Sequence, residues 1–203
     1  MENHESTGKR LGTMMKIYNY QNYNHYVESQ ERTNKQKLNW VYVNKKTIEN
    51  IAIDKKEANN ILCHGTRNGA EQQYFQNLFP NAYIIGTEIS STAHMFPMTI
   101  QHDFTKEKKE WIGKFDIVYS NSFDHSIDPF ETIRVWANQL NDGGKLYLEY
   151  SESQSIGNDA DPLDATANEI QSLIKERLEI VGKITDEVRN KGVIFICERK
   201  KND

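Results

Sequence analysis

Short apolar runs alternate with longer amphipathic stretches from about residue 61 to the end of the chain. The short runs are rich in β-branched and aromatic residues, which favours strands, and the longer stretches repeat apolar residues at helical spacing. Strands are expected at 61–64, 83–87, 98–101, 115–120 and 145–150. Because strands that alternate with helices form parallel sheets, the pattern predicts an α/β fold.

Two of the expected helices have end signals as well as periodicity. The segment 70–79 is closed by Pro80, which cannot continue a helix. The segment 129–140 follows Asp128, a candidate N-cap, and begins with a proline, which suits the first helical position. The sequence Asn-Asp-Gly-Gly at 141–144 supplies its stop. Both helices are expected to pack on the sheet.

The C-terminal end of the chain follows a different pattern. A helix is expected over 164–178, followed by strands at 179–185 and 192–198. Two strands this close pair antiparallel, because a parallel return needs a crossover of a dozen or more residues. The expected architecture is therefore a mostly parallel seven-stranded sheet that ends in a C-terminal antiparallel hairpin.

The N-terminal part of the chain is polar and rich in tyrosine and asparagine. Leu38, Val41 and Ile48 suggest helical turns that lead into the first strand. These differences divide the chain into an N-terminal helical cap or accessory segment, 1–56, and a main domain, 57–203. The tyrosines of the first segment belong either to a lid over the substrate or to a helix packed on the sheet.

Length and charge narrow the function classes. At 203 residues the chain suits one catalytic domain with a modest accessory segment. The 25 Lys+Arg and 29 Asp+Glu are spread along the chain and give a net charge of -4, so a nucleic-acid partner is disfavoured. Because no apolar stretch reaches about 20 residues and the start is polar, no membrane partner is expected and a cytoplasmic location is predicted. The sequence does not specify an oligomeric state.

Cysteine and histidine usage predicts neither a disulfide nor a metal site. Cys63 and Cys197 both lie in strand-like apolar runs, where a free thiol packs as a small hydrophobic group. The six histidines lack the H-E-x-x-H spacing of zinc ligands, and Cys63 has no C-x-x-C partner.

The ends of the first three expected strands carry the candidate chemistry. The first strand runs into the turn CHGTRNG, residues 63–69, and then into a helix. Glycine permits close approach of the backbone to a ligand, and the helix start offers free N–H groups. Glu88 ends the second strand, where a carboxylate can accept both hydroxyl protons of an adenosine ribose, and Asp103 ends the third, where it can accept from an adenine amino group. These strand ends share one edge of the sheet, the ligand edge of open α/β folds.

The order and spacing of these motifs over roughly residues 60–200 resemble the class I (Rossmann-like) S-adenosylmethionine-dependent methyltransferases. The matching elements are the glycine turn, the acids Glu88 and Asp103, the segment DHSIDP at 124–129 and the later LNDGGKL at 140–146. The resemblance implies a three-layer Rossmann-like methyltransferase fold, S-adenosylmethionine as the cofactor, and transfer of its methyl group to an acceptor.

The family's roles carry over to the positions that match its motifs. The resemblance implies that the glycine turn and the end of the fourth strand face the methionine part of the cofactor. It implies that Glu88 binds the ribose and that Asp103 and Phe104 frame the adenine. The implied cofactor-binding residues are His64, Gly65, Thr66, Arg67, Gly69, Glu88, Ile89, Asp103, Phe104, Ser120 and Asn121.

Two departures from the family pattern concern the glycine turn. Cys63 replaces the usual acid before the first glycine, and Arg67 replaces the middle glycine. Arg67 is either a partner for the methionine carboxylate or a solvated loop residue. The departures motivate an alternative function, a non-catalytic binding or regulatory protein with the same fold. A nicotinamide-dependent oxidoreductase is disfavoured, because G-x-G-x-x-G is absent and Arg67 would crowd a pyrophosphate.

His125 is the candidate catalytic residue. Histidine titrates near neutral pH, so His125 can remove the acceptor's proton, and the alternative is a role in packing or loop structure. His64 is expected to be a core or cleft-edge side chain rather than a metal ligand. The predicted acceptor is a small molecule with an oxygen or nitrogen nucleophile.

Overall fold

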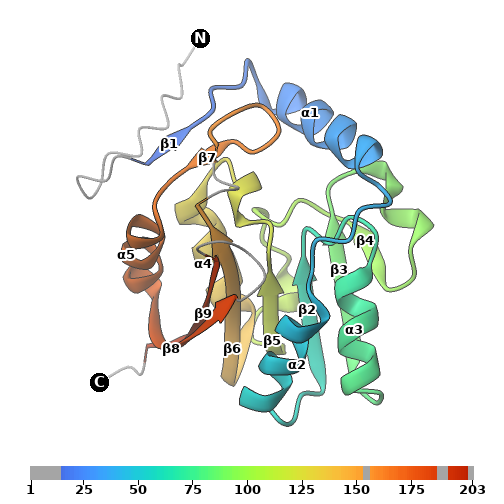
Figure 1. Cartoon of the computed structure of the whole chain (residues 1–203), viewed down its shortest axis with the longest axis vertical. Coiled ribbons are helices and arrows are strands. Elements are labelled where there is room, and N and C mark those ends of the chain that lie inside the picture. The colour runs from blue at the N-terminus through green and yellow to red at the C-terminus, as the bar shows by residue number, and fades with distance from the viewer. Residues whose placement is uncertain (1–14, 153–155, 187–191, 201–203) are drawn as a thin grey trace.

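The computed structural model of the chain describes residues 15–152, 156–186 and 192–200. Its main sheet has seven strands in the order β4-β3-β2-β5-β6-β9-β8 (Figure 1). The strands are β2 (Asn60–His64), β3 (Tyr83–Glu88), β4 (Thr99–Gln101), β5 (Phe115–Ser120), β6 (Leu140–Ser151), β8 (Leu178–Asp186) and β9 (Gly192–Arg199). The first five strands of this order, β4, β3, β2, β5 and β6, pair parallel with their neighbours. The strand β9 pairs antiparallel with both β6 and β8. The predicted mostly parallel sheet with a C-terminal antiparallel hairpin is confirmed.

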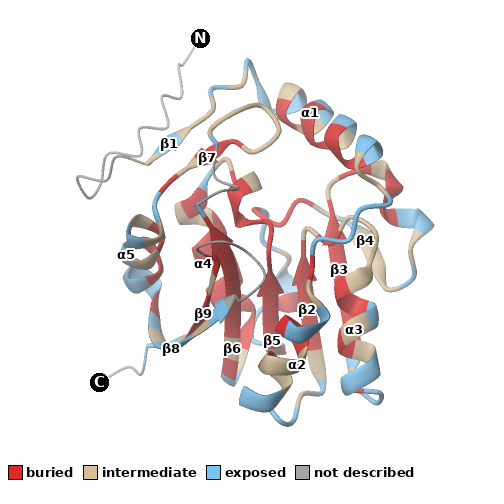
Figure 2. Ribbon diagram, in the orientation of Figure 1, coloured by how far each residue is buried: buried red, intermediate tan, exposed pale blue. Residues whose placement is uncertain are grey.

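Helices cover both faces of this sheet. They are α1 (Tyr23–Gln36), α2 (Lys45–Asp54), α3 (Ala70–Leu78), α4 (Pro129–Gln139), α5 (Ala167–Arg177) and the 3-10 helices η1 (Ser91–Met95), η2 (Lys109–Trp111) and η3 (Phe123–His125). On one face, Ile48 of α2 and Phe75 of α3 join an apolar cluster with the strands. On the other face, Trp136 of α4 and Ile170 of α5 join a second cluster. The fold therefore has the three predicted layers, with the buried strands in the middle (Figure 2).

Local signals explain where α4 begins but not where β6 begins. Asp128 caps the helix, because its side chain accepts a hydrogen bond from the Glu131 N–H at 3.0 Å. The predicted end of this helix is confirmed to within one residue, because α4 ends at Gln139. The predicted strand start at 145 is wrong, since residues 141–144 lie inside β6 at an irregularity in its pairing with β5. Gly143 takes φ 77° there, a conformation that glycine adopts without steric cost.

The predicted start of the last helix is also wrong. α5 begins later, because Thr166 and Glu169 form a capping box in which each side chain accepts from the other's backbone N–H. The residues just before it form β7 (Leu163–Asp164), which pairs antiparallel with β1 (Lys16–Ile17). The sequence pattern did not predict this small second sheet. In the part of the chain that the structure describes, no helix has the length and apolar character of a membrane span.

The helix α1 lies across the carboxyl edge of the main sheet (Figure 1). Leu38 follows it in a turn, Val41 has no regular secondary structure, and Ile48 lies on α2 and is fully buried. The helical turns expected there are therefore found at Ile48 but not at Val41. The buried residues of α1 are mostly polar: Tyr26, Ser29, Gln30, Thr33 and Asn34. A helix that packed only on the sheet would present an apolar stripe, so this polar face needs polar partners.

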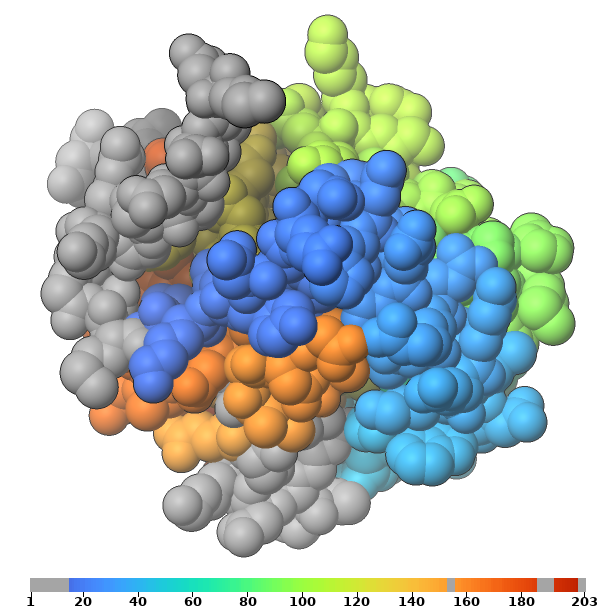
Figure 3. All heavy atoms as spheres, turned by 90° about the horizontal axis from the view of Figure 1, so that it is seen from above, coloured from blue at the N-terminus to red at the C-terminus, as the bar shows by residue number. Residues whose placement is uncertain are grey.

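Some of the polar partners of α1 come from the segment 156–162, which we name the acidic loop. Arg32 of α1 forms an ion pair with Asp159 at 2.5 Å, and the Gln30 amide donates to the Ala160 carbonyl at 3.0 Å. The Tyr20 hydroxyl donates to the Asp159 carbonyl at 2.6 Å. Seen from above, α1 and the acidic loop lie side by side (Figure 3). Together they cover the place where the strand ends converge.

Candidate functional site

The glycine turn after β2 brings the backbone close to its neighbours. Gly65 takes φ 69°, and a Cβ atom at this position would lie 2.5 Å from the Ser122 Cβ. Any larger residue would therefore clash with the segment that follows β5. The Ser122 hydroxyl donates to the Gly65 carbonyl at 2.9 Å, which ties the two strand ends together. Gly65 and Ser122 line both of two adjoining pockets.

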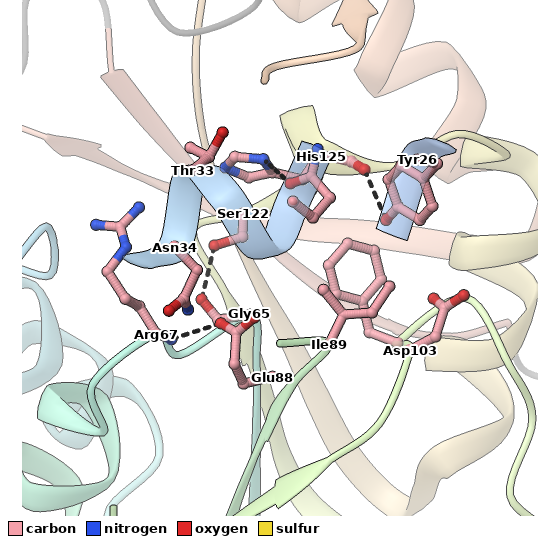
Figure 4. Close-up of a pocket in the computed structure, with 12 residues that line it drawn as sticks. Tyr26, Thr33, Asn34, Gly65, Arg67, Glu88, Ile89, Asp103, Ser122 and His125 are labelled. Carbon is pink, nitrogen blue, oxygen red and sulfur yellow. Dashed lines mark hydrogen bonds between the residues drawn. The ribbon is translucent and has the colours of Figure 1, made fainter. Parts of the chain in front are cut away.

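The first pocket lies between these strand ends and α1 (Figure 4). Glu88 at the end of β3 is only 7% exposed, and burial raises the pKa of its carboxyl. Its oxygens accept the Arg67 N–H at 3.0 Å and the Ser90 N–H at 2.9 Å. A carboxylate has about four acceptor positions, so Glu88 retains capacity for two hydroxyl donors from the pocket.

The roof of the first pocket is the polar face of α1. Asn34 is 5% exposed, and its Oδ1 accepts from the Thr92 hydroxyl at 2.7 Å. Its Nδ2 has no hydrogen-bond partner within the described residues. An unpaired buried donor costs free energy, so a ligand acceptor in the pocket would relieve it. Sequence reasoning missed Asn34, because the sequence does not show where its helix packs. A polar residue on that helix could equally face solvent.

Asp103 and Phe104, after β4, form the far end of the first pocket. Asp103 Oδ1 accepts from the backbone N–H and the hydroxyl of Thr105 at 2.9 and 2.8 Å. Its Oδ2 accepts from the Tyr23 hydroxyl of α1 at 2.7 Å. Burial and this carboxylate raise the pKa of Tyr23, so the tyrosine stays a donor. The acid at the third strand end is thus linked directly to the helix above it.

The second pocket shares Gly65, Arg67, Ser122 and His125 with the first. Glu71 in the first turn of α3 lines it and is only 5% exposed. Burial raises the pKa of this carboxyl to about 7.

One oxygen of Glu71 accepts from the Asn121 amide at 3.3 Å, and the other, Oε2, has no partner within the described residues. Sequence reasoning missed Glu71. The available signal was an acid in the first helical turn of a glycine motif whose usual acid is replaced by Cys63.

Arg67 occupies the middle of the glycine turn in a conformation that favours glycine. Its φ is 42°, and its guanidinium lies 4.7 Å from the centre of the Tyr42 ring. The side chain lines both pockets, so the structure brings a cation to the place where they meet.

His125 also lines both pockets. Its Nδ1 lies 2.9 Å from the Ala160 carbonyl oxygen of the acidic loop and 2.9 Å from Gln30 Oε1 of α1. The Tyr26 hydroxyl donates to the His125 carbonyl at 3.2 Å. The ring is therefore held by the elements that cover the pockets, while its Nε2 faces the second pocket.

Most of the sequence-predicted residues meet at these pockets, but three of them, His64, Gly69 and Ser120, do not line either one. His64 is buried, with its ring nitrogens 2.9 Å from the Thr87 hydroxyl and 2.8 Å from Gln139 Oε1. Burial lowers the pKa of His64 to about 3, so the ring is neutral and belongs to the core. The Ser120 hydroxyl donates to the His64 carbonyl at 3.1 Å. Gly69 serves as the N-cap of α3 with φ 76°.

The two cysteines are buried free thiols, which fits their expected place in apolar strands. Burial raises the pKa of both Cys63 and Cys197. A thiol with a raised pKa remains protonated at neutral pH and is a poor nucleophile. Cys63 therefore does not replace the missing acid by ionising.

No protein-family model matches the chain, and no curated protein matches it in sequence. Among solved structures, it is similar to N-methyltransferase NodS from Bradyrhizobium japonicum, solved with S-adenosylhomocysteine. The identity is 11%, the match covers 85% of this chain and 100% of that chain, and the TM-score is 0.68.

Two further solved structures are similar to the chain. One is 1,6-didemethyltoxoflavin-N1-methyltransferase from Burkholderia thailandensis, with 12% identity, coverage of 88% and 87%, and a TM-score of 0.65. The other is a TehB-like SAM-dependent methyltransferase from Corynebacterium glutamicum, with 12% identity, coverage of 87% and 98%, and a TM-score of 0.59. With its strand order, three layers and C-terminal hairpin, this chain has the fold of the class I (Rossmann-like) S-adenosylmethionine-dependent methyltransferases.

Proposed function

We propose that this chain is an S-adenosylmethionine-dependent methyltransferase that acts on a small-molecule acceptor. One observation carries the proposal: two adjoining pockets contain buried polar atoms, Asn34 Nδ2 and Glu71 Oε2, that lack partners within the described residues. Buried polar groups are normally paired, so a ligand is needed to complete them. A long ligand with a nucleoside at one end and an amino acid at the other suits this pair of pockets.

The first pocket is proposed to hold the adenosine half. The two unused acceptor positions of Glu88 match the two ribose hydroxyls. Ile89 and Phe104 offer apolar surface to the adenine, and Asp103 Oδ2 accepts from its amino group beside Tyr23. Asn34 Nδ2 donates to a ribose or adenine acceptor from above.

The second pocket is proposed to hold the methionine half. The Arg67 guanidinium binds the methionine carboxylate. Arg67 is thus a cofactor-binding residue rather than a solvated loop residue. Glu71 Oε2 accepts from the amino group of the methionine half. Its negative charge takes the place of the acid that the family usually has before the first glycine, where this chain has Cys63. The two departures from the family pattern are thereby accommodated, which favours cofactor binding over a fold that has lost its site.

The acceptor is proposed to enter the second pocket beside His125. Because Nδ1 faces two acceptors, the neutral ring carries its proton there and presents Nε2 as a base. The N-terminal segment 1–56 is proposed to act through α1 as a cap that excludes water over the main domain, 57–203.

Calorimetric titration of the purified chain tests the cofactor. S-adenosylmethionine is expected to bind with a dissociation constant of about micromolar, whereas NADH does not bind. Glu88→Ala is expected to weaken S-adenosylmethionine binding about tenfold or more, because two ribose hydroxyls lose their acceptors. Glu57→Ala is the matched control, since Glu57 is exposed and lies outside both pockets.

The other outcomes separate the alternatives. Binding of neither ligand contradicts the proposal, and tighter binding of NADH favours an oxidoreductase. Binding of S-adenosylmethionine without formation of S-adenosylhomocysteine over a broad acceptor panel favours the non-catalytic protein.

A further inference from the structure

Three exposed apolar side chains line the second pocket. Trp40 and Tyr42 come from residues 37–42, which we name the aromatic strap, and Ile156 comes from the acidic loop. Trp40 is 57% exposed. The other large exposed apolar side chains of the described residues line neither pocket: Tyr23, Val41, Ile53, Leu78, Tyr83, Met95, Ile112 and Val181. Single exposed apolar residues are ordinary, but three that line one polar-rimmed pocket are typical of a ligand site.

The glycine turn holds the aromatic strap in place. Asn68 Nδ2 donates to the Leu38 carbonyl at 2.9 Å and to the Trp40 carbonyl at 3.0 Å. These two bonds use both N–H groups of the Asn68 amide. The Trp40 N–H in turn donates to the Lys37 carbonyl at 2.9 Å. Because the backbone that carries Trp40 is tethered on both sides, a ligand that contacts the strap has less of the chain to order.

The rings of the strap form a flat surface. Trp40 and Tyr42 are stacked, with ring centres 6.3 Å apart and ring planes at 29° to each other. The guanidinium of Arg67 lies 4.7 Å from the centre of the Tyr42 ring, which ties the pair to the glycine turn. Aromatic rings gain more from stacking on such a surface than from area burial alone, whereas aliphatic groups gain only the area. The surface therefore suits a flat aromatic ligand.

The position of the strap favours a small molecule over a protein partner. The second pocket shares Gly65, Ser122 and His125 with the first, so a ligand on the strap lies in the same pocket as the proposed base. Apolar side chains with a few convergent polar groups are the usual lining of a small-molecule pocket. The strap thus extends the proposed cofactor site instead of forming a separate surface.

We propose that the methyl acceptor carries a flat aromatic ring, which stacks on Trp40 of the aromatic strap and contacts Ile156 of the acidic loop. This inference rests on the proposed function and specifies its substrate class. Trp40, Tyr42 and Ile156 bind the ring and take no part in proton transfer. His125 keeps its proposed role as the base.

Two matched pairs of probes test the inference. They are 2-phenylethylamine against 2-cyclohexylethylamine, and 2-phenylethanol against 2-cyclohexylethanol, so each pair keeps its nucleophile and differs only in the ring. Binding is measured by calorimetry in the presence of S-adenosylhomocysteine. The saturated rings are at least as apolar, so the hydrophobic effect alone gives them equal or tighter binding. At least one aromatic probe is expected to bind about three- to tenfold tighter than its saturated partner.

Variants of Trp40 assign this preference to the strap. Trp40→Leu is expected to remove the preference for the aromatic probe, because leucine keeps apolar area without a flat ring. Trp40→Phe is expected to retain it. Tyr83→Leu is the matched control, because Tyr83 is also 57% exposed and lines neither pocket. S-adenosylmethionine affinity is measured for every variant and is expected to remain within about twofold of the unmodified chain.

Fluorescence reports the contact without turnover. The chain has three tryptophans, and Trp111 and Trp136 are buried. Quenching of tryptophan emission by acrylamide therefore arises mainly from Trp40. Saturation with the aromatic probe that binds is expected to reduce this quenching, because the ring covers the indole.

Loss of S-adenosylmethionine binding by the unmodified chain would indicate failure of the proposed function. Other results would overturn the inference while that function stands. They are no aromatic preference in either pair, a preference that survives Trp40→Leu, or acrylamide quenching that the bound probe leaves unchanged. Loss of S-adenosylmethionine binding in Trp40→Leu alone would place Trp40 at the cofactor. A dimer that Trp40→Leu dissociates in sedimentation would make the strap an interface between two copies of the chain.

Discussion

Glu71 carries a buried carboxyl whose pKa burial raises to about 7, against an ordinary value of 4.5. The folded chain therefore holds this proton more tightly than the unfolded chain. Stability from this group is complete below about pH 4.5 and is lost as the pH rises through about 7. The loss reaches roughly 3 kcal/mol on the high-pH side.

We predict that Glu71→Gln removes this loss. The variant is expected to be more stable than the unmodified chain by about 1 to 3 kcal/mol at about pH 8, and equally stable at about pH 4.5. Urea unfolding at both values measures the difference. A variant whose stability relative to the unmodified chain does not change with pH would show that Glu71 titrates normally.

The same residue predicts how cofactor binding depends on pH. The amino group of S-adenosylmethionine pairs with ionised Glu71, and the ionised fraction rises toward pH 7. The dissociation constant is therefore expected to fall about tenfold from about pH 5.5 to about pH 7, with no such fall in Glu71→Gln. Calorimetry at the two pH values measures both proteins. A tenfold fall that persists in the variant would assign the effect to another group.

Arg67 combines a left-handed backbone with a charged side chain. Arg67→Gly is expected to leave the free energy of unfolding within about 1 kcal/mol, because relief of the strained backbone offsets the lost contact with Tyr42. Affinity for S-adenosylmethionine is expected to fall about tenfold or more, because the methionine carboxylate loses its cation.

Arg67→Ala is the control for the two effects. It is expected to lose the same affinity and to be about 1 kcal/mol less stable than the glycine variant, because alanine keeps the left-handed strain. Thermal unfolding and calorimetry separate the two quantities. Full cofactor affinity in either variant would identify Arg67 as a solvated loop residue.

At the scale of elements, α1 is held by other parts of the site rather than by an apolar stripe. Its contacts include the Arg32 ion pair with Asp159, the Tyr23 bond to Asp103 and the Gln30 bond to the acidic loop. These contacts are polar and partly exposed, so the helix is expected to open more easily than the sheet.

Cofactor binding is therefore expected to slow amide hydrogen exchange in α1. The helix gains a ligand contact at Asn34, whereas β5 and residues 146–151 of β6 are already mostly buried and keep their rates. Hydrogen–deuterium exchange with and without S-adenosylhomocysteine measures the change. Equal exchange of α1 in the two states would contradict its role as a cap.

The elements also show what local sequence could predict. The strand β5 was predicted with its correct bounds because an apolar run of this kind is typical of a buried strand. The start of β6 was not, because its Asn-Asp-Gly-Gly residues look like a turn and are drawn into the strand by pairing with β5. The short β1–β7 pair depends on residues far apart in the chain, which periodicity does not relate.

At the scale of the whole molecule, the order of strand-end motifs predicted which edge of the sheet carries the two pockets. Parallel strands end at one edge, so Gly65, Glu88 and Asp103 had to converge there. The sequence could not predict that α1 and the acidic loop would cover that edge. The meeting of Asn34 and Asp161 with His125 depends on how α1 and the acidic loop fold over the sheet. No local pattern specifies that contact.

The most direct test of the central claim is a crystal structure of the chain with S-adenosylhomocysteine. The account predicts the ribose hydroxyls on Glu88, the amino group within hydrogen-bond distance of Glu71 Oε2, and the carboxylate on Arg67, all beneath α1. A ligand bound outside the two pockets, or one that leaves Glu71 and Asn34 without partners, would contradict it.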